Sequence, residues 1–179
     1  MSDSAIIVAE LTTSAEEAPA RAAAVADWLL DQRIIQPNDQ PDPLWWPSQY
    51  IPGPAAAAAV RDLRHNTGLI GDGIDILDHR QVHDPGGNYT PPTCPNCTTP
   101  FDEDAHITLI KTWLDRTEPL VTCENCATAT LLGDWTGPWA IHVANLAVRF
   151  HNWPPLSDTF ILELGDRLGP RCRLIHKRI

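Results

Sequence analysis

The apolar positions at the start of the chain change from a strand pattern to a helix pattern. Residues 5–11 are rich in β-branched side chains, which favours a β-strand. Ser14 and Glu17 have the spacing of a capping box, and Pro19 favours a helix that begins near residue 18. Apolar residues then recur at helical spacing up to about residue 33: Ala22, Val25, Ala26, Leu29 and Leu30. The N-terminal segment therefore predicts a βα unit.

The C-terminal part predicts the same elements in another order. Residues 139–150 are rich in β-forming side chains, and the alternation slips near Asn145, which predicts a bulge or a tight turn. Ser157 can cap a helix that Gly169 ends. Residues 171–179 then predict a closing strand.

The pattern is less regular between these two parts. Residues 36–54 contain six prolines together with Trp45, Trp46 and Tyr50, which predicts an extended loop whose aromatic side chains cover the core or form a binding surface. A short helix is predicted over residues 55–64, and a strand-like pattern extends from residue 73 to residue 83.

The order of these elements predicts an α+β fold. A strand–helix–strand order on each side of a central segment favours a ferredoxin-like, split βαβ sheet, and a less regular α+β sandwich is the alternative. Residues 1–93 and 135–179 would together form one α+β domain, and residues 94–134 would be an insertion. A chain of 179 residues can bury enough surface for one such core without disulfides.

Four cysteines inside the predicted insertion carry the clearest chemical signal. They form two Cys-x-x-Cys pairs separated by residues 98–122: Cys94, Cys97, Cys123 and Cys126. Two such turns can direct four sulfur atoms at one tetrahedral zinc, and the interval suits two short strands and a connection, as in a zinc ribbon. Four thiolates leave no open coordination position, which favours a structural over a catalytic zinc.

Other uses of four cysteines are less consistent with the sequence. Disulfides are disfavoured because the first residues lack the basic region of a secretory signal. Redox dithiols usually lie where a strand meets a helix, whereas both pairs lie among loop residues. One iron held by four thiolates has the same geometry, so zinc and iron both remain open.

The charge of the chain is strongly negative and unevenly distributed. The net charge is −10, and residues 94–134 contain seven acidic and two basic side chains. Residues 135–179 contain six basic and three acidic side chains, which include Arg171 and Arg173. An acidic surface opposes general binding to nucleic acid and suits a basic protein partner. No apolar run approaches the 18 or so residues of a membrane span, so a cytoplasmic protein without a membrane partner is expected.

Two further sets of residues are candidates for chemistry. Cys172 alternates with Leu174 in the closing strand, which predicts a buried, unreactive thiol whose arginine neighbours point to the opposite face. His79 and His83 are four residues apart in the predicted strand and would share a face close to several aspartates. A second metal site there is conceivable, but an acidic turn in solvent is the simpler interpretation.

Part of the chain resembles a known group of proteins. The motifs Leu132-Gly133-Asp134-Trp135, Asn145-Leu146-Ala147-Val148 and Asn152-Trp153-Pro154-Pro155-Leu156 resemble those of an uncharacterised actinobacterial family with an inserted four-cysteine zinc ribbon. The resemblance extends from the first cysteine pair to the end of the chain. That family has no known activity, so the resemblance implies the architecture and the zinc but no mechanism.

The sequence leaves three classes of function. The first is a non-enzymatic zinc-containing protein-interaction module, one version of which is an immunity or antitoxin-like protein that masks a basic partner. The second is a nucleic-acid or transcription-associated zinc-ribbon protein that uses the C-terminal arginines. The third is a metal-dependent enzyme that uses His79 and His83. The sequence does not indicate the oligomeric state.

Overall fold

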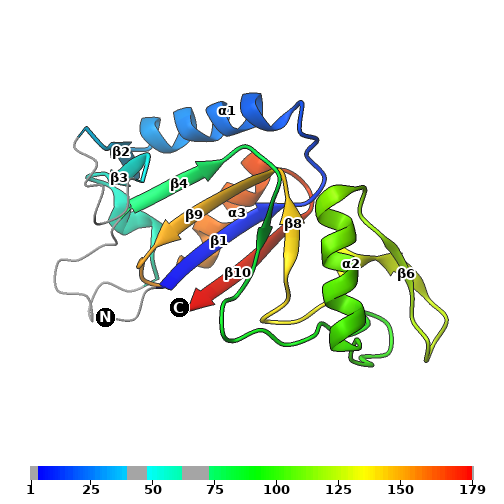
Figure 1. The fold of residues 1–179 in the computed structure, drawn as a ribbon. Helices are drawn as coiled ribbons and strands as arrows, with labels where there is room; N and C mark the ends of the chain where they lie inside the picture. The colour runs from blue at the N-terminus through cyan, green and yellow to red at the C-terminus, as the bar shows by residue number, and fades with distance from the viewer. Residues whose placement is uncertain (1–3, 40–47, 62–72, 179) are drawn as a thin grey trace.

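A six-stranded antiparallel sheet forms the centre of the molecule. The computed structural model describes residues 4–39, 48–61 and 73–178. The strand order is β10-β1-β9-β4-β3-β2, and every neighbouring pair is antiparallel (Figure 1). The strands are β1 (Ser4–Glu10), β2 (Ile35–Pro37), β3 (Tyr50–Pro52), β4 (Gly73–Leu77), β9 (Leu146–His151) and β10 (Cys172–Arg178). The predicted α+β class is confirmed, whereas the ferredoxin-like topology stays a prediction.

β1 lies in the interior of this sheet because both of its faces are apolar. Ile6 and Val8 point to one face and Ile7 to the other, and all three are buried. The strand pairs with β10 on one side and with β9 on the other, so that Val8 lies opposite both Leu174 and Val148. A continuous apolar run of this kind is typical of a strand that is covered on both faces.

Helices α1 (Ala18–Asp31) and α3 (Asp158–Leu168) cover one face of the sheet (Figure 1). The Ser14–Glu17 capping box forms, since the Glu17 amide donates to Ser14 Oγ at 3.2 Å and the Ser14 amide donates to Glu17 Oε2 at 3.3 Å. Ser157 Oγ accepts from the Phe160 amide, and Gly169, with φ 146°, follows the last turn of α3. Ser157 and Gly169 thus set the two ends of α3 as predicted, whereas α1 begins after Glu17 without a side-chain cap, and the Ser14–Glu17 pair stabilises the turn before it.

A long excursion from the sheet joins β4 to β9. It contains helix α2 (Glu103–Asp115), the paired strands β5 (Gln81–His83) and β8 (His142–Ala144), and the hairpin of β6 (Leu120–Thr122) and β7 (Ala129–Leu131). In Figure 1 this excursion extends from one end of the sheet, with β6 farther from the sheet than α2. Ile110 and Trp113 of α2 pack on Val143 of β8, which attaches the helix to the body.

Several local predictions need correction. The interval between the cysteine pairs holds α2 and β6 in place of two short strands, because His106, Ile110 and Trp113 form one buried helical face. The strand pattern at residues 73–83 divides into β4 and β5. The predicted helix at 55–64 is a 3-10 turn, η1 (Ala56–Ala59), and residues 62–64 lie outside the described residues.

The proline-rich segment also differs in part from the prediction. Its ends form the short strands β2 and β3, which extend the sheet beyond β4. Pro37 and Pro52 lie at the ends of these two strands, where a missing amide donor is tolerated. Trp45 and Trp46 lie outside the described residues. Among the described residues, no helix is long and apolar enough to cross a membrane.

Candidate metal centre

The four cysteine sulfur atoms converge on one point. The ligand atoms of Cys94, Cys97, Cys123 and Cys126 all lie within 4.8 Å of one another. The Cys94 and Cys126 sulfurs are 3.7 Å apart, and those of Cys97 and Cys123 are 3.6 Å apart. Zn–S bonds of about 2.3 Å in a tetrahedron place the sulfurs about 3.8 Å apart, so the spacing fits a bound metal. All five cysteines of the chain are free thiols, which excludes the disulfide alternative in this structure.

Each cysteine pair lies in a turn with the same backbone hydrogen bonds. In the first turn, the Cys94 amide donates to the Thr99 carbonyl at 2.8 Å and the Thr98 amide donates to the Cys94 carbonyl at 2.9 Å. In the second turn, Cys123 bonds to Thr128 and to Ala127 in the same way, at 2.9 Å for both bonds. The two turns are therefore two copies of one structural unit.

The equivalent residues of the two turns match in sequence as well as in geometry. Both turns follow the pattern Cys-x-Asn-Cys-x-Thr, which is a short internal repeat of the sequence. Thr98 and Ala127 occupy the same position and have φ values of 59° and 57°. A left-handed conformation at this position is costly for a residue with a Cβ, so the turn geometry imposes it.

The polar side chains of each turn stabilise thiolates. Hydrogen bonds from Asn96 and Thr128 lower the pKa of Cys126 to about 5. Thr99 and Asn125 lower the pKa of Cys97 in the same way. Each asparagine thus serves a cysteine of the other turn, which couples the two halves of the site. Thiolates are the form that binds metal, so these bonds favour the metal-binding form of Cys97 and Cys126, whereas burial and the neighbouring thiols raise the pKa of Cys123 to about 11.

Aromatic side chains enclose the cysteines on one side. Trp135 packs against Cys94 and Cys123, and Phe101 lies over Trp135 with ring centroids 4.5 Å apart. The buried contacts of Trp135 are therefore with the cysteines themselves. Trp139 lies nearer the body, where its ring meets His176 of β10 at 6.5 Å.

Ion pairs attach the four-cysteine module, defined here as residues 94–134, to β10. Arg171 binds Glu118 through two nitrogens and Asp134 through Nε, the last at 2.8 Å. Arg173 Nη2 also binds Asp134, at 2.7 Å. The Gly133 amide donates to Glu118, and the Gly133 carbonyl accepts from Arg173. The C-terminal arginines predicted to be available for nucleic acid are therefore engaged within the molecule.

Other basic residues are engaged in a similar way. Lys177 binds Asp84 at 2.9 Å, and Arg80 donates to the carbonyls of residues 113, 114 and 116 at the end of α2. A cation at the C-terminus of a helix is favourable because it lies at the negative end of the helix dipole. Cys172 is half-buried against the core, less than the full burial that was predicted, and burial raises the pKa of its thiol to about 11, which keeps it protonated near pH 7.

The structure separates the two histidines proposed for an enzyme. His79 precedes β5 with a side chain that is 67% exposed, whereas His83 is buried in β5. The predicted continuous strand is interrupted, so His79 lies in the connection between β4 and β5, where it faces Asp78 at 3.5 Å, and not in a strand with His83. Asp75 binds His151 and Asp84 binds Lys177, so neither carboxylate is directed at the pair. Within the described ranges, the four cysteines are the only group of three or more residues placed to hold a metal.

A cluster of buried histidines was not predicted. His83 and His142 are opposite each other on β5 and β8, and His106 of α2 lies nearby and bonds to Tyr89 at 2.8 Å. Burial lowers the pKa of His83 and of His106 to about 4, and that of His142 to about 3, with Arg149 adding to the effect at His83 and Arg173 to that at His142. All three are therefore neutral near pH 7. Position 106 is detectable from the helical spacing of residues 106, 110 and 113, but the pairing of the other two depends on tertiary structure.

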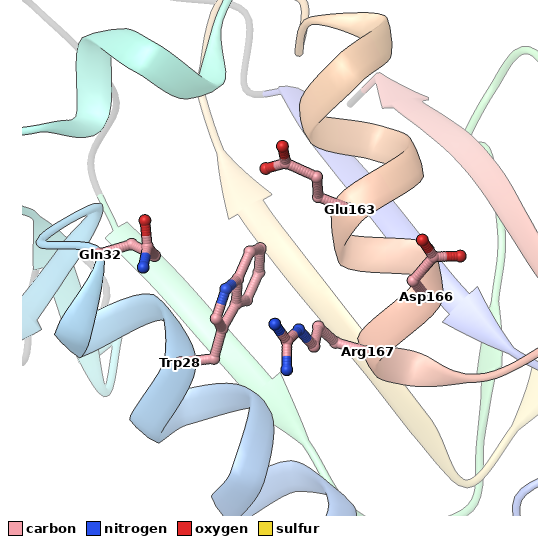
Figure 2. Close-up of a pocket in the computed structure, with 5 residues that line it drawn as sticks. All are labelled: Trp28, Gln32, Glu163, Asp166 and Arg167. Atoms are coloured by element: carbon pink, nitrogen blue, oxygen red, sulfur yellow. The ribbon is translucent and has the colours of Figure 1, made fainter.

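A shallow pocket lies between α1 and α3, away from the cysteines. Figure 2 shows Trp28 of α1 beside Arg167 of α3, whose guanidinium carbon is 5.6 Å from the ring centroid. The carboxylates of Glu163 and Asp166 point in different directions in this view. Because Arg167 is engaged with Trp28 and the two carboxylates do not converge, this pocket has the features of a shallow surface groove and carries no chemistry.

Comparisons with known proteins add no relative. No family model, curated protein or solved structure matches this chain. The resemblance to actinobacterial proteins with an inserted zinc ribbon accordingly stays a prediction, and the argument for function depends on the geometry of the chain itself.

Proposed function

We propose that this protein is a zinc-containing protein-interaction module without enzymatic activity. The observation that carries the proposal is the closed set of four cysteines, which leaves a bound ion no position for a substrate or water. A metal of this kind contributes to folding and not to a reaction. We assign the ion as zinc because four thiolates in a tetrahedral arrangement suit it, with iron as the alternative to be tested.

The charge distribution supports a protein partner over nucleic acid. Arg171, Arg173 and Lys177 each pair with a carboxylate of the same chain, which reduces the cationic surface available to phosphates. The four-cysteine module also exposes acidic side chains that form no ion pair with a described residue: Asp102, Glu103, Asp104 and Glu124. An acidic exposed module attracts basic proteins and repels phosphate backbones. The finer version of the proposal is an immunity or antitoxin-like protein that masks a basic partner in the cytoplasm.

The architecture that we infer is a ferredoxin-like sheet with a long insertion. The elements β1, α1, β4, β9, α3 and β10 give the order βαββαβ, and their strands lie in the order β10-β1-β9-β4. This agrees with a split βαβ arrangement, to which β2 and β3 add an extension at one edge. The excursion between Leu77 and Leu146 contains more than residues 94–134, so we place β5 and β8 with the insertion as its base.

Metal analysis and capture of partners test the proposal together. Purified protein should contain one zinc per chain, and cobalt substitution should give the spectrum of a tetrahedral tetrathiolate site, both lost in Cys126→Ser. Tagged protein expressed in the native host should capture a basic protein. This association should persist after nuclease treatment and should be absent with Cys126→Ser. Absence of any specific partner would contradict the interaction function, and salt-dependent binding to nucleic acid would favour the second class.

A further inference from the structure

A small pocket beside the four cysteines has the features of a docking site. It has a volume of about 190 Å³, and its apolar walls come from Phe101, Val121 and Trp135. Pockets for free small molecules are usually about 300–1,000 Å³, so this one suits a single side chain of a larger partner. Its lining includes Cys123, which places it directly against the metal centre.

The rim of this pocket is acidic. Asp102 and Glu124 line it, and both are exposed. Glu103 and Asp104 follow Asp102 in the first turn of α2 and are exposed as well. No basic side chain lines the pocket. An apolar floor with a carboxylate rim is complementary to an apolar side chain with Lys or Arg on either side.

The ring of Trp135 forms part of the pocket wall. The residue is 4% exposed, and its Nε1–H is itself buried and has no hydrogen-bond partner among the described residues. The wall is therefore set by packing, and a side chain that enters the pocket would contact the ring face or edge. The indole N–H lies close enough to this wall to report a change in its packing.

The geometry points to this pocket as the docking site for a basic segment of another protein, with one apolar side chain inserted between Phe101, Val121 and Trp135. The inference rests on the proposed function and names the chemistry of the partner. The carboxylates of Asp102 and Glu124 would then contact the flanking basic residues. Since the pocket wall contains Cys123, docking would require the metal-bound form of the module.

The test uses the zinc-loaded full chain and three synthetic peptides. The first peptide has one central leucine flanked by lysine and arginine, the second replaces leucine by serine, and the third replaces the basic residues by glutamate. The reporter is the indole N–H resonance of Trp135, identified by its loss in Trp135→Phe. We expect the first peptide to shift this resonance at concentrations where the second and third do not. Equal binding of the first and second peptides would overturn the inference, because it would reduce the effect to charge alone.

Variants of the chain sharpen this test. Ala105 is exposed and lines the pocket, so Ala105→Phe should fill it and weaken the first peptide by about tenfold or more, with zinc content unchanged. Asp102→Ser keeps a capping oxygen for the Ala105 amide, and both it and Glu124→Gln should weaken binding about two- to fivefold. The matched control is Glu163→Gln on α3, which should have no effect.

The outcomes distinguish the pocket from the broader function. If Ala105→Phe binds the first peptide as the unaltered chain does, the pocket is not the docking site. If a host partner is captured and persists with Ala105→Phe, the interaction function stands but another surface mediates it. If the peptide binds but no host partner is captured, the pocket is correct as a binding surface and the proposed function is not supported.

Discussion

The sheet and the four-cysteine module differ in what holds them together. The sheet and its two helices enclose a large apolar core that includes Phe150, Leu164 and Leu168, each fully buried. The cluster around the cysteines contains only Cys94, Cys123 and Trp135 as buried members. In the hairpin of the module, Leu120 is 68% exposed, so the hairpin lacks the apolar cover that stabilises the sheet. The comparison teaches that one chain can combine a body folded by apolar burial with a hairpin that has little apolar cover and four converging cysteines, for which we propose stabilisation by a bound ion.

Metal removal should have the largest effect on the difference in stability between the two regions. Structural zinc contributes on the order of 10 kcal/mol at neutral pH. Chelation, or Cys123→Ser, should unfold the cysteine turns and the hairpin of β6 and β7 while the sheet remains, and α2 should stay attached through the packing of Ile110 and Trp113 on β8. Hydrogen exchange should show lost protection in β6 and β7 and retained protection in β1 and β9. An unchanged exchange pattern in metal-free protein would contradict the metal dependence.

A core truncation should have the reverse pattern. Phe150→Ala removes a fully buried ring that contacts Trp153 and Phe160, and it should lower the free energy of unfolding by about 3–5 kcal/mol. Urea denaturation measures the loss, and the folded variant should still contain one metal per chain. Loss of metal without loss of global stability would show that the two regions are not separable as described.

Disruption of the ion pairs between the regions should have a smaller effect. Arg171→Ala leaves Glu118 without its cation, whereas Asp134 keeps Arg173, and we expect a loss of about 3 kcal/mol because the Arg171 and Glu118 side chains are only 16% and 12% exposed. The matched control is Arg61→Ala, whose partner Asp158 is largely exposed, with an expected loss below about 0.5 kcal/mol. Equal effects from the two variants would refute a special role for the junction.

Acid should destabilise the paired strands β5 and β8 through their buried histidines. The pKa of His83 is lowered to about 4, so the unfolded chain binds more protons than the folded chain between about pH 6.5 and pH 4, and stability falls as the pH falls through that window. His83→Leu should reduce this pH dependence by about 1–2 kcal/mol at pH 5. Neither ring nitrogen of His83 has a hydrogen-bond partner within residues 4–39, 48–61 and 73–178, so the variant should not lose stability at pH 7.

Urea midpoints at pH 7 and pH 5 measure this effect, with metal content followed in parallel. His79→Gln is the control, because that side chain is exposed and should leave the pH dependence unchanged. A pH dependence of His83→Leu equal to that of the unaltered chain would contradict the assignment.

The smallest effect concerns the backbone of the cysteine turns. Ala127 has φ 57°, a conformation that glycine adopts without the steric cost of a Cβ. Ala127→Gly should therefore stabilise the metal-bound module by about 0.5–1 kcal/mol, measured by thermal unfolding. The same replacement in a helix, Ala105→Gly, should cost about 1 kcal/mol. A loss of stability in both variants would indicate that the turn does not need this conformation.

The elements predicted correctly are those specified by local signals. The capping residues Ser14 and Ser157 and the stop at Gly169 are short-range features, so the sequence shows them directly. The cysteine ligands were also predictable, since each pair lies within one turn. The sequence also contains the signals of α2, since Asp102 caps it and its buried residues follow helical spacing. The spacing of the cysteine pairs predicts a ribbon over the same residues, so the two local signals conflict.

The remaining features depend on contacts between distant residues. Arg171 pairs with Glu118, and His83 pairs with His142. The partners in each pair are far apart in sequence, so no local pattern predicts either contact. The strands β2 and β3 were not predicted because both contain proline, a residue that disfavours strands except at edges and ends. The pocket beside the cysteines required α2 to be placed against β6, and the interval between the cysteine pairs alone did not specify that packing.

The register of β4 and β9 has a consequence for engineering. Leu77 and Ala147 lie directly opposite each other at the point where the chain leaves and re-enters the sheet. A two-residue Asn-Gly hairpin turn could bridge strands in this relation. The whole excursion is thus excisable in principle, and a shortened chain would report whether the sheet is a self-sufficient scaffold onto which other loops can be grafted.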